Sequence, residues 1–362
     1  MPQFNDLTVK SIRQLTAGSV EISFNVPDEL SESYVYEHGQ FVVLRAMIND
    51  ELVERAYSIC RAPYERQLNV AVKCVEQGIF SSYATSKLKE GDVLSVSKPN
   101  GAFTCSLDSS KAKQYLFIAA GSGITPVIPI LKTVLASEPQ SQCVLFFGNK
   151  TTGDVMFLDE LVALKNRYSE QLQIEWLLSQ EAPTTQLSTA DVLLKTGTIH
   201  HGRINQAVVE KCLTKERVSS LSNVFLCGPE EMALDFREYF LNQRLLPENV
   251  KIELFSSVNP LSDADEESVS NVQVKLLIDG EEIEVVYEDP TESILEHALR
   301  IDPDLPYGCQ NGSCGACQAK LMSGKVSMIN NYALSDSEVE EGYVLLCQAR
   351  PKSKNVAISY DE

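Results

Sequence analysis

The chain has 362 residues, of which 44% are hydrophobic, and a formal net charge of −19 at pH 7. This length exceeds what one ordinary hydrophobic core organises, so two or three domains are expected. No apolar run approaches the roughly 20 residues of a membrane-spanning helix, and the first residues lack the basic and apolar regions of a secretory signal. The negative charge makes nucleic acid and anionic membrane surfaces poor partners.

Residues 1–106 are expected to form an antiparallel β-barrel. Short segments in which apolar and polar residues alternate are separated by turn residues such as Asn49-Asp50. Many short strands at this spacing are typical of a closed barrel. The expected strands cover residues 7–12, 20–26, 41–44, 68–73 and 93–97.

Residues 107–255 show a different rhythm, in which apolar strands alternate with helices. This alternation predicts a parallel α/β sheet that binds ligands at the carboxyl ends of its strands. The expected strands cover residues 115–120, 143–148, 172–178, 223–229 and 250–255, and the expected helices cover residues 127–136, 156–166 and 230–242.

Residues 256–270 are polar, acidic and unpatterned, which is typical of a linker. In residues 271–362, strands are expected at 272–278 and 282–287 around the turn Asp279-Gly280, followed by a helix at 293–300. From residue 256 to the end there are 20 Asp and Glu residues against 7 Lys and Arg residues. A solvated surface would show the same excess, but it also suits an acidic electron carrier that docks on a basic face of its partner.

Four cysteines have the spacing of a plant-type [2Fe–2S] cluster. Cys309, Cys314 and Cys317 follow the pattern C-x4-C-x2-C, and Cys347 lies 30 residues further on. The loop is rich in glycine and other small residues, which let the backbone approach the cluster closely. A zinc site is the alternative, but zinc sites usually combine two closely spaced cysteine pairs, and Cys347 has no near partner in the sequence.

The other six cysteines are scattered, mostly inside apolar runs. They are Cys60, Cys74, Cys105, Cys143, Cys212 and Cys227. Residues of this kind are typical of reduced, buried thiols. A reduced set of cysteines predicts a cytoplasmic protein without structural disulfides.

Two turns with glycine lie at strand ends of the α/β region. Gly121-Ser-Gly123-Ile-Thr125-Pro126 follows a strand and opens a helix, as a dinucleotide-binding loop does. A tight strand-to-helix turn would contain the same glycines, and Pro126 stands where the usual third glycine is expected. Cys227-Gly228-Pro229 ends a later strand, where a buried structural cysteine is the simpler interpretation of Cys227.

Taken together, these features resemble the ferredoxin-reductase superfamily. Arg55-Ala-Tyr57-Ser58 ends a barrel strand one domain before a nucleotide-type α/β domain, and residues 121–126 resemble the superfamily loop G-x-G-[IV]-[TA]-P. The domain order resembles that of iron–sulfur flavoprotein reductases over nearly the whole chain. Within that group, residues 57–60, 119–126 and 342–349 resemble the reductase subunits of phenylacetyl-CoA epoxidase complexes.

The resemblance implies an FAD-binding barrel over residues 1–106, an α/β nicotinamide-nucleotide domain over residues 107–255 and a β-grasp ferredoxin domain over residues 271–362. It also implies that FAD lies between the first two of these domains. Arg55 is then expected to meet the flavin pyrophosphate with a bidentate guanidinium. Tyr57 is expected to pack on the ribityl chain and ring, and the Ser58 hydroxyl to reach flavin N5 in a catalytic role.

A second flavin loop is implied by the same resemblance. It consists of Gly78, Ile79, Phe80 and Ser81, and the preceding strand contributes Val72 and Lys73. Backbone N–H groups of such a loop cradle the pyrophosphate, and the strand residues are expected to offer main-chain contacts. Phosphate loops of this sort favour FAD over FMN.

The nicotinamide is expected next to the flavin. Thr125 would face both rings, and Cys227, with Gly228 and Pro229 beside it, would lie near the position of hydride transfer as a catalytic residue. Met232 is expected to line the same cleft. In addition, Glu253 and Phe255 resemble an acidic and an aromatic residue that some members place against flavin and nicotinamide, although a plain edge strand would look the same.

The adenosine ribose is expected at Asn149 and Lys150, directly after the second strand of the α/β region. Sites for NADH often present an Asp or Glu there, whereas a lysine can pair with a 2′-phosphate. Lys150 therefore favours NADPH, and the nearby Asp154 and Asp159 leave NADH open.

No further catalytic signature emerges from the chain, such as a nucleophile elbow, a P-loop or paired carboxylates. The histidines have no metal-ligand spacing with one another, so they are expected to be surface or structural residues. They are His38, His200, His201 and His297.

The expected activity is electron transfer from NAD(P)H through FAD and a [2Fe–2S] cluster to an oxygenase, such as a di-iron epoxidase, or to another electron-accepting protein. The alternatives are a reductase for a Rieske-type oxygenase, a fatty-acid desaturase or a hybrid-cluster protein, and a redox-sensing module without turnover. A sensor has no reason to retain both the flavin residues 55–58 and the turn 227–229, so the sequence favours the enzyme.

Overall fold

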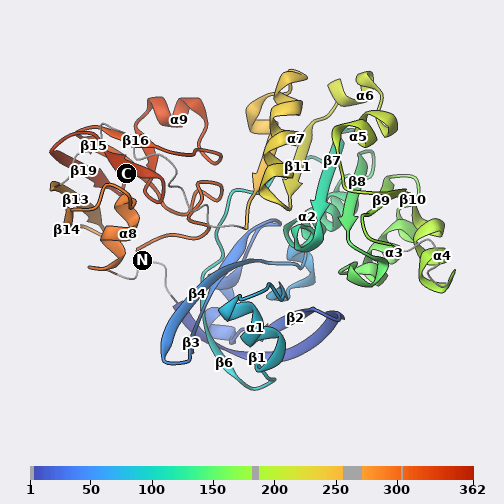
Figure 1. Ribbon diagram of the computed structural model, residues 1–362, viewed down its shortest axis with the longest axis horizontal. Coiled ribbons are helices and arrows are strands. Elements are labelled where there is room, and N and C mark those ends of the chain that lie inside the picture. Colours follow the sequence, from blue (N-terminus) through green and yellow to red (C-terminus); the bar gives the residue numbers. More distant parts are fainter. Residues whose placement is uncertain (1–3, 182–186, 256–270, 303–304) are drawn as a thin grey trace. The chain divides into compact units, whose positions relative to one another are not determined.

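The computed structural model describes residues 4–181, 187–255, 271–302 and 305–362 (Figure 1). It contains two compact units, of which one spans residues 5–253 and the other runs from Leu254 to Glu362. The first unit holds two six-stranded sheets, and the second holds a five-stranded and a two-stranded sheet. The expected linker, residues 256–270, lies outside the described residues.

The first sheet has the strand order β4–β3–β6–β1–β2–β5. Ile59, directly after β4, bridges to Val70 of β5, so the two outer strands of the sheet meet and the barrel closes. The predicted antiparallel β-barrel is confirmed. Its elements are β1 (Phe4–Thr16), β2 (Ser19–Asn25), β3 (Phe41–Ile48), β4 (Glu51–Ser58), β5 (Asn69–Lys73), β6 (Val93–Ser97), the helix α1 (Ile79–Ser86) and the short helices η1 (Asp28–Tyr34) and η2 (Pro63–Glu65).

Two-residue turns set the register of the hairpins. Ile48 pairs with Glu51 across the turn Asn49-Asp50, whose residues have φ angles of 54° and 65°. Left-handed values at both central positions are those of a type I′ turn, which matches the twist of the flanking strands. Asp279-Gly280, with φ angles of 50° and 78°, joins the first two strands of the second unit in the same way.

The second sheet has the order β10–β9–β8–β7–β11–β12, and its neighbouring strands are parallel. The chain moves outward from β7 to β10 and then returns to β11 beside β7, so the topology switches direction between these two strands. Its elements are β7 (Gln114–Ala120), α2 (Ile124–Ser137), β8 (Gln142–Asn149), α3 (Leu158–Arg167), β9 (Leu172–Leu178), α4 (Leu187–Thr196), β10 (Thr198–His201), α5 (Gln206–Cys212), α6 (Lys215–Ser219), β11 (Asn223–Cys227), α7 (Glu230–Asn242), β12 (Val250–Glu253) and the short helices η3 (Gly121–Gly123), η4 (Thr152–Asp154) and η5 (Pro247–Asn249).

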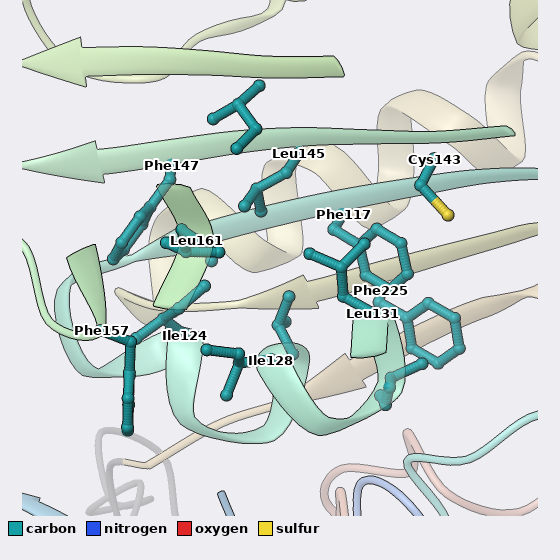
Figure 2. Packing of buried hydrophobic residues seen from close by; sticks show 14 of the residues in the cluster. Phe117, Ile124, Ile128, Leu131, Cys143, Leu145, Phe147, Phe157, Leu161 and Phe225 are labelled. Carbon is teal, nitrogen blue, oxygen red and sulfur yellow. The ribbon is translucent and has the colours of Figure 1, made fainter. Parts of the chain in front are cut away.

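Helices α2 and α3 cover one face of this sheet. Figure 2 shows Ile128 and Leu131 of α2 among the side chains of the central strands, and these residues are fully buried. Phe117 of β7 and Phe225 of β11 stack with ring centroids 5.3 Å apart, which ties together the two strands at the switch point. The apolar residues of α2 are thus explained by burial rather than by contact with a ligand.

The second unit is a mixed sheet with the order β14–β13–β19–β15–β17, in which β13 and β19 are parallel. Helix α8 buries Ile294 and Leu295 against this sheet, as in a β-grasp domain. The elements are β13 (Val272–Ile278), β14 (Glu281–Tyr287), α8 (Ile294–Leu299), β15 (Gln318–Ser323), β16 (Val326–Met328), α9 (Asp336–Glu340), β17 (Tyr343–Leu345), β18 (Ala349–Pro351) and β19 (Asn355–Ser359).

All ten cysteines lie in the described residues, and all are free. Cys60, Cys143 and Cys227 are buried, as predicted. The prediction is wrong for Cys74, which directly follows β5 and is exposed, and Cys105 and Cys212 are only half-buried. Among the described residues, no helix is long and apolar enough to cross a membrane.

A set of opposite charges joins the barrel to the α/β sheet within the first unit. We call it the Glu160 network, and it consists of Arg13, Glu21, Arg61, Glu65, Lys132 and Glu160. The Glu160 carboxylate of α3 lies 2.6 Å from Lys132 Nζ, 2.7 Å from Arg13 and 3.1 Å from Arg61. Lys132 also contacts Glu65 of the barrel at 3.1 Å. Each charge of this network therefore has a partner of opposite sign.

The network lowers the pKa values of two of its carboxyl groups, Glu160 and Glu21. Burial by itself raises the pKa of Glu160, but the hydrogen bond and charge of Lys132 and the charge of Arg61 outweigh burial and lower this pKa below its ordinary value. Glu21 behaves alike: burial raises its pKa, and the hydrogen bond from Asn69 and the charge of Arg61 lower it overall. Both carboxylates are therefore ionised, and their cationic partners stabilise them.

Removing one charge of this network should lower the free energy of unfolding of the first unit. We expect Glu160→Gln to lower the free energy of unfolding by about 3 kcal/mol, because Lys132, Arg13 and Arg61 each lose one carboxylate partner while they stay in place. Urea unfolding followed by the fluorescence of Trp176, the single tryptophan and a fully buried residue of β9, measures the effect in the first unit. Lys111→Met is the control, because Lys111 is exposed and its pair with Asp108 should contribute less than about 1 kcal/mol. Equal losses in the two variants would contradict the role of the network.

The same variant gives a pH dependence of defined sign. Because the folded-state pKa of Glu160 is depressed, the stabilisation is present above the unfolded pKa of about 4.3 and is lost as the pH falls through the folded pKa. We expect the stability difference between the native protein and Glu160→Gln to be constant from about pH 7 to about pH 5 and to shrink below that. A difference that grows on acidification would refute the assignment.

Candidate functional site

The site begins at the switch point of the parallel sheet, where β7 and β11 end side by side. Gly123, in the loop after β7, lies against the peptide between Cys227 and Gly228 at the end of β11. A Cβ on Gly123 would lie 2.1 Å from the Cys227 carbonyl oxygen and 2.9 Å from the Gly228 nitrogen. Only glycine permits this approach, so the two turns that the sequence singled out form one surface.

The end of β12 adds an acidic side chain to this surface. Glu253 lies opposite Cys227 in the parallel register, and the Ser58 hydroxyl donates a 2.6 Å hydrogen bond to Glu253 Oε1. This hydrogen bond is buried and links the end of barrel strand β4 to the α/β sheet, across 195 positions of the sequence. Ser58, Cys227 and Glu253 therefore converge.

Cys227 is fully buried. Burial, followed by the negative charge of Glu253, raises the pKa of its thiol well above the ordinary value. The thiol is therefore neutral and is not an activated nucleophile, since nucleophilic cysteines have depressed pKa values. This environment suits a small neutral group that packs beside a bound ring.

The barrel side of the site presents an aromatic pair. The Tyr57 ring lies 5.4 Å from the Phe80 ring, and burial raises the pKa of the Tyr57 phenol, which stays neutral. Arg55, two residues earlier, is exposed and donates one hydrogen bond of 2.6 Å to the Glu54 carbonyl. Arg55 and Tyr57 lie on the same face of β4, because side chains two apart in a strand share a face.

Helix α1 begins at the expected second flavin loop. Gly78 is its N-cap and forms no side-chain cap hydrogen bond, so the first N–H groups of α1 can donate to a bound anion. A Cβ on Gly78 would lie 2.3 Å from Ser81 Oγ, which keeps this cradle free of side chains. Ile79 is exposed and Phe80 is buried, so the helix turns its apolar face inward and leaves its N-terminus accessible.

Strand β5, which precedes this loop, contains the two remaining residues of the expected flavin site, Val72 and Lys73. Val72 is fully buried in the barrel core, so only its main chain can reach a ligand. Lys73 Nζ lies 3.7 Å from the place of a Cβ on Gly121, at the loop after β7. Gly121 has a φ of 56°, in the left-handed region that favours glycine. A lysine charge beside a glycine loop is a suitable neighbour for a phosphate.

Thr125, Pro126, Pro229 and Met232 lie beside the two turns of the first unit, whereas Phe255 belongs to the second unit. Thr125 and Pro126 are buried in the first turn of α2. Met232 Cε lies 2.8 Å from the place of a Cβ on Gly228, and Pro229 is the N-cap of α7. Phe255 follows β12 and is 46% exposed.

Asn149 ends β8 with a buried side chain whose amide oxygen and nitrogen have no hydrogen-bond partner within the described part of the chain. Buried polar groups are nearly always paired, so this amide is suited to a bound polar ligand. Lys150 is exposed next to it. The Asp154 carboxylate accepts hydrogen bonds from Thr151, at 2.7 Å from the hydroxyl, and is thus committed to the local turn.

Sequence reasoning missed Glu181, which follows β9. Its carboxylate accepts a 2.6 Å hydrogen bond from the Thr152 backbone N–H, close to the end of β8. No local pattern marks this residue, because its partner lies 29 positions away. Glu181 adds an acidic group to the edge at which Asn149 and Lys150 lie.

The second unit gathers the four predicted cluster cysteines in two pairs. The Cys309 thiolate accepts a hydrogen bond from Cys314, which lowers the pKa of Cys309 below its ordinary value and raises that of Cys314. Cys317 hydrogen bonds to Cys347, which with burial raises the pKa of Cys317. Two thiols per iron is the arrangement that a [2Fe–2S] cluster requires.

The loop around these thiols points N–H groups at sulfur. Asn311 N lies 3.5 Å from Cys309 Sγ, and Ala316 N lies 3.5 Å from Cys314 Sγ. A Cβ on Gly312, whose φ is 82°, would lie 2.9 Å from the Asn330 carbonyl oxygen. The loop therefore fits a [2Fe–2S] cluster in three ways. Its thiols can bind the irons, its N–H groups point at sulfur, and glycine at position 312 lets the backbone pack closely.

Three family profiles match the chain in order. They describe an oxidoreductase FAD-binding domain over residues 6–105, an oxidoreductase NAD-binding domain over residues 117–238 and a 2Fe-2S iron-sulfur cluster binding domain over residues 276–352. The predictions of FAD, a nicotinamide nucleotide and a [2Fe–2S] cluster are confirmed.

The relatives extend over the whole chain. It is 37% identical to a component of the 1,2-phenylacetyl-CoA epoxidase of Escherichia coli K12, over 100% of this chain and 99% of that protein. It is 31% identical to the ferredoxin reductase component of 3-ketosteroid-9-alpha-monooxygenase of Rhodococcus rhodochrous, over 98% and 96% of the two chains. The fold is similar to phthalate dioxygenase reductase, with a TM-score of 0.54 at 22% identity over 98% of each chain. The chain therefore belongs to the iron–sulfur flavoprotein reductases, oxidoreductases that pass electrons from a nicotinamide nucleotide through FAD and a [2Fe–2S] cluster to oxygenase components.

Proposed function

We propose that this reductase takes electrons from NADPH and delivers them to the oxygenase component of a phenylacetyl-CoA epoxidase. The observation that carries the proposal is the full-length identity of 37% to the epoxidase component of Escherichia coli, against 31% to the ketosteroid monooxygenase reductase. Two features support NADPH over NADH. Lys150 is exposed and can pair with a 2′-phosphate, and the Asp154 carboxylate is already hydrogen bonded to Thr151.

We further propose that the predicted site residues act as follows, beginning with the flavin. Bound FAD and the cluster convert the two-electron hydride of the nucleotide into single electrons. Arg55 and the N-terminus of α1 supply positive charge and N–H donors for the pyrophosphate. The half-buried Tyr57 and the buried Phe80 provide an aromatic wall that excludes water. Because Ser58 donates its own proton to Glu253, its oxygen keeps acceptor capacity for an N–H group.

On the α/β side, the chain shapes the position of the nicotinamide. The contact of Gly123 with the Cys227–Gly228 peptide holds the two turns together at the carboxyl ends of β7 and β11. The neutral Cys227 thiol places no charge where a hydride leaves or arrives, and Thr125 offers a hydroxyl beside it. Asn149 and Lys150 are assigned to the adenosine ribose. Phe255 is assigned to the flavin and nicotinamide rings.

The domain boundaries that we propose are residues 1–106 for the flavin domain, 107–255 for the nicotinamide domain, 256–270 for the linker and 271–362 for the ferredoxin domain. We also propose that the ferredoxin domain docks through its acidic surface on a basic face of the oxygenase. Strand β14 exposes Glu281, Glu282 and Glu284 in one short segment. The six cysteines outside the cluster form no disulfide, which supports a cytoplasmic location, where thiols stay reduced.

The function is tested by mixing the holoprotein with the oxygenase component of the Escherichia coli epoxidase, phenylacetyl-CoA and NADPH. Epoxide formation in step with NADPH oxidation is the expected result, with a lower rate when NADH replaces NADPH. The matched control is Cys347→Ser, which should keep FAD and its reduction by NADPH but lose product formation, because one iron then lacks a thiolate. If NADPH reduces the wild-type flavin and cluster but no epoxide forms, the electron relay stands and the choice of partner is wrong.

The nicotinamide surface is tested by Gly123→Ala. Because the new Cβ meets backbone atoms of Cys227, we expect the rate of flavin reduction by NADPH to fall about 100-fold, as displacements of about 1 Å commonly cause. Stopped-flow absorbance under anaerobic conditions measures this rate. Gly18→Ala is the control, since a Cβ there meets nothing within 4 Å and the rate should be unchanged. A Gly123→Ala variant with the wild-type rate would remove this surface from the site.

A further inference from the structure

Three side chains with metal-ligating atoms meet in the α/β sheet, away from the switch point. They are Glu175 of β9, His200 of β10 and Cys212 at the end of α5, and we name them the Glu175 cluster. Ile174 and Trp176 belong to the core under α2, so the intervening Glu175 side chain points to the opposite face of the sheet.

The parallel register brings the second ligand to that face. Thr198 of β10 is the partner of Glu175, and His200 lies two residues beyond it, so its imidazole shares the face of Glu175. Helix α5 follows β10 and delivers Cys212 to the same place. The three residues come from three elements and are separated by 25 and 12 positions, as their contacts record.

The distances approach those of a coordination site. His200 Nε2 lies 2.6 Å from Glu175 Oε2 and 3.8 Å from Cys212 Sγ, and the ligand atoms of the cluster all lie within 4.8 Å of one another. In a tetrahedral zinc site, bonds of about 2.0 Å to nitrogen and about 2.3 Å to sulfur place these two atoms about 3.5 Å apart. The cluster reaches such a geometry when the Glu175–His200 hydrogen bond opens by less than about 1 Å.

The carboxylate is already oriented by outer contacts. Gln173 Nε2 donates a 2.8 Å hydrogen bond to Glu175 Oε1, and Arg217 of α6 donates a 3.0 Å hydrogen bond to Gln173 Oε1. These contacts occupy Oε1 and leave Oε2 directed at His200. Supporting hydrogen bonds of this kind hold metal ligands in place.

We propose that the Glu175 cluster binds one divalent transition-metal ion of the zinc class, with a water molecule as the fourth ligand. A thiolate and an imidazole together select such an ion over Mg²⁺ or Ca²⁺, which prefer oxygen ligands. The His200 side chain is 15% exposed and Cys212 is half-buried, so an ion can enter from solvent. The bound ion ties β9, the edge strand β10 and α5 together.

A hydrogen-bonded pair of Glu175 and His200 would satisfy the buried carboxylate without any ion. The Cys212 thiol lies 3.8 Å from the same imidazole nitrogen and also interacts with the Glu175 carboxylate, so it completes the set of three ligands. The two accounts differ in one measurable property, which is a zinc affinity that depends on Cys212.

The test uses the full-length holoprotein after treatment with a chelating resin, titrated with ZnCl2 by isothermal titration calorimetry. We expect one Zn²⁺ per chain, unaffected by excess Mg²⁺. X-ray absorption at the zinc edge should show one sulfur at about 2.3 Å and nitrogen or oxygen at about 2.0 Å. Cys212→Ser and His200→Gln should each weaken Zn²⁺ binding about 100-fold, and Gln173→Leu about 10-fold.

Cys105→Ser is the matched control. Cys105 Sγ also lies near a histidine, 3.7 Å from His38 Nε2, but within the described residues no carboxylate completes that pair as a group of three. The Zn²⁺ affinity of the Cys105→Ser variant should equal that of the wild type. Iron content and the visible spectrum report that each variant is folded and that zinc has not replaced the cluster.

Three results would overturn the proposal: no Zn²⁺ binding, an affinity unchanged in Cys212→Ser, or a zinc site with several sulfur ligands, which would place the ion at the cluster cysteines. If Cys212→Ser does not fold, His200→Gln and the single sulfur in the wild-type absorption spectrum decide the matter.

Discussion

The first unit depends on the pairing of buried charges between its two sheets. In the Glu160 network, barrel residues and helix residues neutralise one another, and a desolvated charge without its partner is strongly unfavourable. The packing of the barrel against the sheet brings Arg13 and Arg61 of the barrel to Glu160, which also pairs with Lys132. That packing also brings Ser58 at the end of β4 to Glu253 at the end of β12. The geometry of the flavin side of the site therefore follows from electrostatic pairing elsewhere in the same unit.

Close backbone approach determines the other half of the site. The loop after β7 can rest on the end of β11 only because Gly123 has no Cβ, and the stacking of Phe117 on Phe225 holds the two strands in register below it. Apolar packing beneath the strands thus supports the contact between the two turns at their carboxyl ends. A hydride transfer needs such support, because the rate depends steeply on the position of the reacting atoms.

Local sequence signals predicted much of this structure. The turn at Asn49-Asp50, the helix after Gly123 and the cluster loop after Cys309 depend on residues within about ten positions, where turn chemistry and spacing act directly. The helices and strand between residues 187 and 219 were not predicted, because that segment lacks clear apolar periodicity. Contacts between distant residues were not predicted either. Glu181 meets Thr152, and Glu175 meets His200 and Cys212, only when the parallel strands align.

Polar groups in the α/β sheet separate into two kinds according to their partners. The Asn149 amide is buried at a strand end with no hydrogen-bond partner in the described part of the chain, at a cost of about 1–3 kcal/mol, which a bound nucleotide can recover. Glu175, by contrast, is hydrogen bonded to Gln173 and His200, so an ion at its cluster must replace one of these contacts. Only an ion that binds imidazole and thiolate strongly gains enough to do so, which excludes Mg²⁺ and Ca²⁺ on energetic as well as geometric grounds. The Asn149 amide thus leaves polar groups for a ligand, which we propose to be the nucleotide, whereas the Glu175 cluster is stable alone and becomes selective because binding must displace a hydrogen bond.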